Sequence, residues 1–242
     1  MLRDTRLICF VSHSPSQKVL HDNAHAVGCF LGSLKSLEVL DYHGIQPALL
    51  EGMAEAGSNL RELRLEGRTL CTRASQAIAS LYMLRCLNIT AESSADVAPL
   101  ASLKQLKYLV IVDEFVAVHG LAEGVAGMQK LDYLRLPRVL GGVLAALPPT
   151  LTSIRLGIAS ISDVTDIVSH AGLPALQHLG VGRLHCSDVK DMSDARRAGD
   201  ALSSRWQPGT QSGGVVFEHV LEVASLDAFL HICSCAPSKP KT

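Results

Sequence analysis

Apolar residues recur along this chain in a fixed phrase, in which two residues separate the first apolar position from the second and one residue separates the second from the third. The phrase occurs seven times, and its middle residues stand at positions 40, 63, 87, 109, 134, 154 and 179. Because successive side chains of a strand point to opposite faces, the phrase predicts short strands whose apolar residues face a core. Its period of 20 to 25 residues predicts stacked units, each too small to bury its own apolar face.

The seven copies are Leu37, Leu40, Tyr42; Leu60, Leu63, Leu65; Leu84, Leu87, Ile89; Leu106, Leu109, Ile111; Leu131, Leu134, Leu136; Leu151, Ile154, Leu156; and Leu176, Leu179, Val181. Between them lie alanine-rich stretches that favour short helices or helical turns. These stretches are Arg73–Leu81, Ala95–Leu103, Leu121–Met128 and Ser162–Ala171. Strands that alternate with short helices must all run in the same direction, so the pattern predicts an α/β chain with a parallel sheet.

The repeated phrase resembles the leucine-rich-repeat family over residues 34–186. The resemblance implies a curved horseshoe-shaped solenoid, with the parallel sheet on its concave face and short helices on its convex face. The family usually places Asn or Cys three residues after the third apolar position, where the side chain bonds the turning backbone. This chain has other residues there, so its turns must be satisfied differently. They are Ile45, Arg68, Glu92, Glu114, Val139, Ala159 and Leu184.

Around the repeats we expect one domain with caps at both ends. Residues 1–33 are predicted to form an N-terminal cap, with a strand at Leu7–Val11 and a helix at Val19–Leu31. Residues 34–186 are the repeats, 187–214 a polar insert with a short helix at Asp191–Ser203, 215–236 a C-terminal cap, and 237–242 a disordered tail. Val215–Phe217 is predicted to close the sheet, and Ser225–Cys233 has helical spacing.

The charge of the chain bears on its partner, and its cysteine content bears on its cellular location. The 242 residues carry a formal net charge of −1 with a pI of about 6.8, which gives no overall attraction to nucleic acid or to an anionic membrane. No apolar run approaches the length of about 18 residues that spans a bilayer. The seven cysteines lack the paired spacing of a zinc module, so a reducing, cytoplasmic location is the simpler expectation. We expect the chain to be monomeric by itself.

The residues between the apolar positions are predicted to line the concave face. One column precedes the middle apolar residue of each copy and another follows it. In adjacent copies these columns bring together Tyr108, Tyr133, Arg135 and Arg155, which are residue types that dominate many binding interfaces. The candidate protein-binding residues are Tyr108, Tyr133, Arg135, Arg155, Arg64 and His178. The alternative is that they are ordinary solvated side chains.

The sequence contains only weak candidates for catalytic or metal-binding sites. His21 and His25 stand four residues apart, a spacing that can hold a metal on a helix, but the zinc-hydrolase glutamate and a third ligand are missing. Cys186 has His185 and Asp188 beside it in sequence, yet adjacency does not supply the geometry that activates a nucleophile. We therefore predict no catalytic residue, no metal and no cofactor.

The sequence thus predicts a non-catalytic scaffold that binds another polypeptide on its concave strand surface. One alternative is a substrate-recognition subunit of a cullin-type ubiquitin ligase, although no segment resembles the F-box that precedes the repeats in such proteins. Another alternative is a thiol enzyme centred on Cys186.

Overall fold

The computed structural model describes residues 23–44, 46–67, 70–91, 97–112, 120–138, 143–186, 196–197, 199–201 and 214–223. The chain divides into two compact units, Met1–Leu131 and Asp132–Thr242. Each unit contains a parallel sheet, with its strands in sequence order. Both units therefore have the predicted α/β class.

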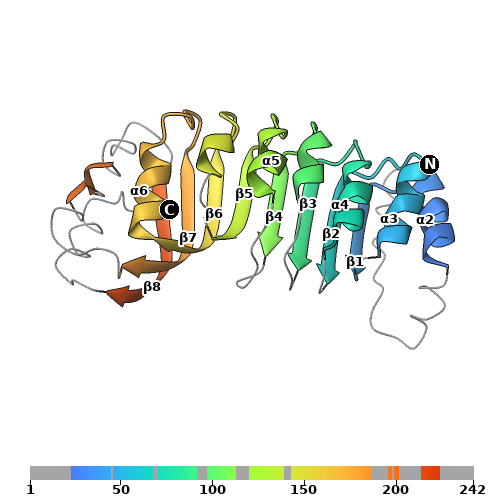
Figure 1. Ribbon diagram of the computed structural model, residues 1–242, viewed down its shortest axis with the longest axis horizontal. Coiled ribbons are helices and arrows are strands. Elements are labelled where there is room, and N and C mark those ends of the chain that lie inside the picture. Colours follow the sequence, from blue (N-terminus) through green and yellow to red (C-terminus); the bar gives the residue numbers. More distant parts are fainter. Residues whose placement is uncertain are drawn as a thin grey trace, which may run out of the picture. The chain divides into compact units, whose positions relative to one another are not determined.

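The sheet of the first unit contains four strands that correspond to the first four copies of the phrase. They are β1 (Val39–His43), β2 (Glu62–Gly67), β3 (Cys86–Ala91) and β4 (Tyr108–Val112), shown in blue to green in Figure 1. The middle apolar residues are in register across the sheet, because Leu40 pairs with Leu63, Leu63 with Leu87 and Leu87 with Leu109. Residues at the same position of the phrase therefore lie side by side in neighbouring strands.

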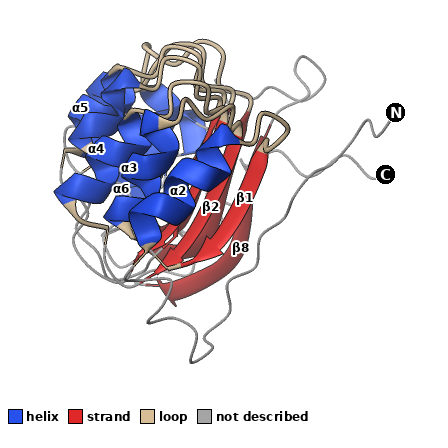
Figure 2. Ribbon diagram, turned by 90° about the vertical axis from the view of Figure 1, so that its right-hand side faces the viewer, coloured by secondary structure: helices blue, strands red, loops and turns tan. Residues whose placement is uncertain are grey.

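Helices of the first unit cover one face of this sheet (Figure 2). They are α2 (Ala24–Ser33), α3 (Pro47–Glu55), α4 (Thr72–Ala79), the 3-10 helix η1 (Ala98–Ser102) and α5 (Leu121–Ala126). The segment Ala95–Leu103 was expected to be helical and is a 3-10 helix over five residues. A 3-10 turn rises about 2.0 Å per residue, so it spans a connection with fewer residues than an α-helix does.

The second unit repeats this architecture, and three of its four strands, β6 to β8, are longer than any strand of the first unit. It contains β5 (Tyr133–Arg138), β6 (Ser153–Ser160), β7 (His178–Cys186) and β8 (Gly214–Val223), connected in part by η2 (Leu144–Ala146) and α6 (Ile161–Ser169). A capping box begins α6: the backbone N–H of Asp163 donates to Ser160 Oγ, and that of Ser160 donates to the Asp163 carboxylate. β6 therefore passes directly into its helix.

The core consists of the apolar phrase. All three apolar residues are buried in each of the seven copies, and the most exposed of them, Tyr42, is 4% accessible. Helix residues such as Met53, Ile78 and Val125 complete the core of the first unit at 0% exposure. The predicted inward orientation of the phrase is confirmed.

Backbone hydrogen bonds connect neighbouring repeats where the strands begin. The carbonyl of Arg61 accepts the N–H groups of Arg85 and Cys86 at 2.8 and 3.0 Å, and the carbonyl of Arg85 accepts those of Lys107 and Tyr108 at 2.8 and 3.0 Å. The same arrangement recurs in the second unit at Asp132 and at Thr152. The entry turns are thus satisfied by the backbone.

The position at which Asn or Cys was expected lies three residues after the third apolar residue, towards the end of each strand. The structure describes this position in two of the seven copies. Ala159 and Leu184 are both buried, and β6 and β7 continue through them. The extension needs two glycines where the strands come unusually close: a Cβ on Gly157 would lie 2.8 Å from the Pro137 carbonyl oxygen, and a Cβ on Gly182 would lie 2.8 Å from that of Gly157. The other five positions lie outside the described residues.

Several sequence predictions fall partly or wholly outside the described residues. Leu7–Val11, Ser225–Cys233 and the tail 237–242 lie outside them, and of the predicted N-terminal helix only the part within α2 is described. Residues 196–197 and 199–201, within the predicted insert helix, are helical, and Val215–Phe217 adds to the sheet as part of β8. No helix in the described part of the chain has the length and apolar character needed to cross a membrane.

Candidate functional site

In each unit, the strand face opposite the core is here called the open face. The open face of the first unit has two rows of residues in register across β1 to β4. The first row is Val39, Glu62, Cys86 and Tyr108, and the second is Asp41, Arg64, Asn88 and Val110. Both rows match the columns predicted from the sequence.

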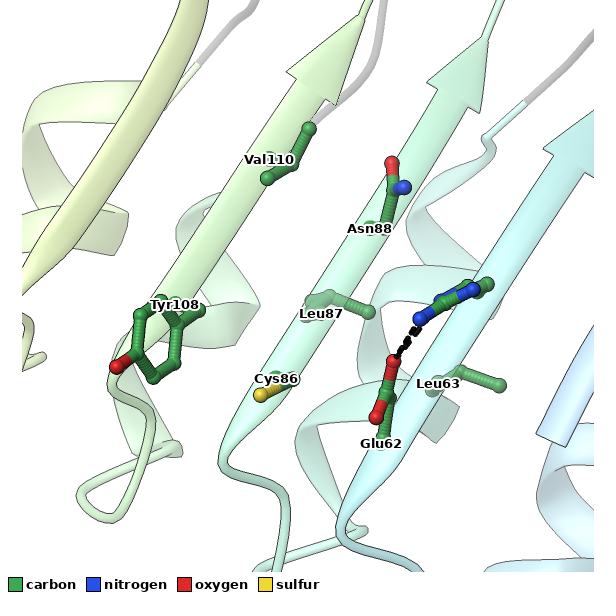
Figure 3. Close-up of a pocket in the computed structure, with 8 residues that line it drawn as sticks. Glu62, Leu63, Cys86, Leu87, Asn88, Tyr108 and Val110 are labelled. Atoms are coloured by element: carbon green, nitrogen blue, oxygen red, sulfur yellow. Dashed lines mark hydrogen bonds and ion pairs between the residues drawn. The ribbon is translucent and has the colours of Figure 1, made fainter. Parts of the chain in front are cut away.

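A shallow hollow of about 230 Å³ lies on the open face of the first unit (Figure 3). Its polar and aromatic lining comes from Glu62, Arg64, Cys86, Asn88 and Tyr108. Tyr108 is 43% exposed, so its ring is accessible from solvent. Pockets for small ligands usually measure about 300–1,000 Å³, so this hollow is better suited to a side chain than to a whole cofactor.

Arg64 is paired within its own strand. Its Nε and Nη2 atoms lie 2.8 and 2.6 Å from Glu62 Oε1, and the dashed line in Figure 3 marks this contact. The two residues are two positions apart, so both side chains project from the same face. The charge of Arg64 is therefore balanced locally. His43 is similarly paired, with Nδ1 2.6 Å from Glu66 Oε2.

Two further groups in the hollow have unusual surroundings. Burial raises the pKa of the Cys86 thiol, and the nearby Glu62 charge raises it further. Asn88 Oδ1 is buried and accepts no hydrogen bond from the described residues. Such an acceptor requires an explanation, because buried polar atoms are nearly always bonded. A donor from a bound molecule would satisfy it.

The open face of the second unit is arranged differently. Its first row is Tyr133, Ser153 and His178, its second is Arg135, Arg155 and Gly180, and its third is Arg138, Ile158 and Arg183. Arg138, His178 and Arg183 are exposed, while Arg135 and Arg155 are partly buried. The sequences of β5, β6 and β7 contain no Asp or Glu. This face is therefore rich in arginine on three adjacent strands.

Arg155 extends sideways over its neighbour. A Cβ placed on Gly180 would lie 3.3 Å from Arg155 Cγ and 3.8 Å from Cδ. Gly180 thus leaves room for the aliphatic part of the arginine to cross from β6 towards β7. A side chain supported in this way loses less conformational freedom on binding than one that extends freely into solvent.

The six sequence-predicted residues are divided between the units. Arg64 and Tyr108 lie on the open face of the first unit, while Tyr133, Arg135, Arg155 and His178 lie on that of the second. Sequence reasoning did not select Glu62, Arg138 or Arg183. Glu62 could have been found from its i, i+2 spacing to Arg64. The two arginines follow the repeated phrase, and they join the face because the strands extend beyond it.

The histidine pair proposed from sequence is only half described, because His21 lies outside the described residues. His25 Nε2 on α2 is 3.1 Å from Glu55 Oε2 on α3, and Cys29 Sγ is 3.8 Å from His25 Nδ1. The side chains of His25 and Glu55 are 50% and 66% exposed, so they form a surface ion pair between two helices when His25 is protonated. The side chain of Cys186 is outside the described part of the structure.

Within each unit, every repeat contributes one strand and one return segment. The strands are parallel and in register, and the apolar residues of the phrase are buried. The chain has a leucine-rich-repeat fold. No protein-family model and no curated protein matches the sequence.

Solved structures that resemble the chain include the following two. An internalin from Listeria monocytogenes is 18% identical over 84% of this chain and 61% of its own, with a TM-score of 0.49. A leucine-rich-repeat protein from Leptospira interrogans is 14% identical over 83% of this chain and 54% of its own, with a TM-score of 0.43. The chain thus matches less than two thirds of the length of either structure.

Proposed function

We propose that this chain is a non-catalytic scaffold that binds a polypeptide on the open faces of its strands. The main observation behind the proposal is that each strand has one buried side and one side that faces away from the core. The phrase residues are buried in the core, while the alternating positions present Tyr, Arg, His and Asn at matching levels in neighbouring strands. Large side chains with directed polar ends are typical of binding surfaces.

The chemistry of the first open face supports binding rather than catalysis. A reactive cysteine requires a lowered thiol pKa, whereas the pKa of Cys86 is raised by burial. The hollow beside it is smaller than a typical small-molecule pocket. The proposal therefore includes no catalytic residue, no metal and no cofactor.

We also propose that the chain works in a reducing compartment, the cytoplasm, and is monomeric by itself. Cys29, Cys71 and Cys86 have free thiols, which supports this location. The ubiquitin-ligase alternative gains no support from the similar structures, and the thiol-enzyme alternative depends on Cys186, outside the described side chains. Fractionation of cells and light scattering of the purified chain test the location and the monomer.

Affinity capture followed by mass spectrometry tests the binding proposal. The bait is the full chain, compared with a variant in which Tyr108, Tyr133, Arg135 and Arg155 are all changed to alanine. The matched control changes exposed helix-side residues instead, namely Arg73→Ala and Gln76→Ala. A partner captured by the wild type and by the control, but not by the open-face variant, is the expected result. Equal capture by all three folded baits would contradict the proposal.

A further inference from the structure

Helices α2 and α3 of the first unit pack against each other through glycines. A Cβ on Gly28 of α2 would collide with the backbone carbonyl of Leu49 on α3, and a Cβ on Gly52 of α3 would collide with that of His25 on α2. Only glycine permits such a close approach of two helix backbones. The helix surfaces that flank these glycines are therefore held close together.

Three side chains that can bind a metal meet at this contact, namely His25, Cys29 and Glu55. His25 and Cys29 stand one helical turn apart on α2, so they project from the same face, and Glu55 is the last residue of α3. His25 Nε2 lies 3.1 Å from Glu55 Oε2, and Cys29 Sγ lies 3.8 Å from His25 Nδ1. With one ligand atom taken from each residue, the three atoms lie within 4.8 Å of one another.

The three ligand types are those that zinc binds. Zn²⁺ binds thiolate sulfur, imidazole nitrogen and carboxylate oxygen at about 2.0–2.3 Å, so two ligand atoms of a tetrahedral site lie about 3.3–3.6 Å apart. The side chains of His25 and Glu55 are 50% and 66% exposed, so both can rotate to reach these separations. Calcium and magnesium prefer ligand sets made of oxygen, and the mixed set therefore favours zinc over them.

We propose that His25, Cys29 and Glu55 bind one Zn²⁺ ion that joins α2 to α3, with a water molecule as the fourth ligand. Sequence spacing did not reveal this group, because Glu55 lies 30 residues after His25 and the fold brings the two together. The site lies in the helical layer of the first unit, whereas the proposed polypeptide surface is the opposite face of the sheet (Figure 2). The inference therefore goes beyond the scaffold function, which uses no metal.

The neighbouring carboxylate on α3 is already engaged. Glu51 stands one helical turn before Glu55, and its two oxygens accept hydrogen bonds from Arg73 at 2.6 and 2.7 Å. Glu51 is therefore not counted as a ligand. The pair His43 and Glu66, 2.6 Å apart, provides a contrast on the strands, because no third metal-binding side chain joins it among the described residues.

Titration of the reduced full chain with Co²⁺ tests the inference, because cobalt occupies zinc sites and a thiolate–cobalt bond absorbs in the near ultraviolet. The expected result is a saturable thiolate–cobalt band that disappears when Zn²⁺ is added. Cys29→Ser should abolish the band. His25→Ala and Glu55→Gln should each weaken cobalt binding by about 10-fold or more, since even residues that only orient a metal ligand cost about 10-fold in affinity.

Matched variants and thermal melts control the titration. Cys71→Ser removes an exposed thiol elsewhere on the helical side, and His43→Ala removes the histidine of the other pair, so both should leave the titration unchanged. Zn²⁺ should raise the melting temperature of the wild type, because an ion that binds only the folded chain stabilises it. The rise should be absent from Cys29→Ser. Far-ultraviolet circular dichroism without metal shows whether each variant is folded.

Three outcomes would overturn the inference. They are no thiolate–cobalt band in the wild type, a band that survives in Cys29→Ser, and a cobalt affinity unchanged by both His25→Ala and Glu55→Gln. The last outcome would leave a lone cysteine as the binding group. Affinity capture by the open faces is measured separately, so failure of the zinc site would leave the scaffold function standing.

Discussion

Arg135 and Arg155 face the same side of adjacent parallel strands, with their Cα atoms paired between β5 and β6. Replacing Arg135 with Glu would place an opposite charge beside Arg155, so we predict a gain in the free energy of unfolding of about 0.2–1 kcal/mol. Arg135→Gln removes the charge alone and should lie between the two. Urea denaturation of the three proteins provides the comparison. A Glu variant less stable than the Gln variant would show that repulsion between the two arginines does not govern stability at this position.

Leu109 tests the inward orientation of the apolar phrase. It is 0% exposed in β4, and truncation to alanine should reduce the free energy of unfolding by about 2–5 kcal/mol by opening a cavity. The neighbouring Val110, on the open face, is the control, because Val110→Ala removes fewer buried contacts. A thermal melt unchanged by Leu109→Ala, or a larger loss at Val110, would contradict the orientation.

Gly182 tests the close approach of β7 to β6. A Cβ there would meet the backbone carbonyl of Gly157 at 2.8 Å, which the sheet can relieve only by moving. We expect Gly182→Ala to cost about 1–3 kcal/mol in chemical denaturation, as overpacking usually does. At Gly180 the nearest atom is Arg155 Cγ at 3.3 Å, and a flexible side chain can give way, so Gly180→Ala should cost less. Equal losses of unfolding free energy in the two variants would contradict the prediction that the backbone contact at Gly182 is the more costly one.

Cys86 provides a prediction about pH. Its thiol pKa is raised by burial and by the charge of Glu62, so less of the reactive thiolate is present near pH 7 than in an ordinary cysteine. Alkylation by iodoacetamide, followed by peptide mapping, should be slower at Cys86 than at the exposed Cys71. The rate at Cys86 should still be rising with pH beyond the ordinary thiol pKa, about 8.5, where labelling of an ordinary cysteine begins to level off. Glu62→Gln should accelerate it at neutral pH, and faster labelling of Cys86 than of Cys71 in the wild type would contradict this assignment.

The repeat architecture could be predicted from sequence, because the apolar positions of the phrase determine both which residues are buried and which residues pair between neighbouring strands. Leu63, Leu87 and Leu109 are equivalent in the phrase, and they are paired across the sheet. The residues between them therefore fall into rows without further information. That is why Arg135 and Arg155 could be placed on neighbouring strands in advance.

Other features of the surface depend on interactions that the phrase does not contain. Arg64 was selected as a contact residue, yet it is paired with Glu62, a contact set by side-chain conformation. Arg138 and Arg183 follow the phrase in β5 and β7, where they are exposed and in register with Ile158, and close strand approaches occur beside them at Gly157 and Gly182. The apolar phrase alone gives no sign that the strands continue to these residues.

Site-specific photo-crosslinking tests the central claim, polypeptide binding by the open faces, most directly. Arg138, at the edge of the open face of the second unit, and Gln76, exposed on α4, would each be replaced with p-benzoylphenylalanine in the full chain. On irradiation in cell extract, we predict a crosslinked partner polypeptide from position 138 and none from position 76. A partner crosslinked from position 76 and absent at position 138 would contradict the claim and place binding on the helices.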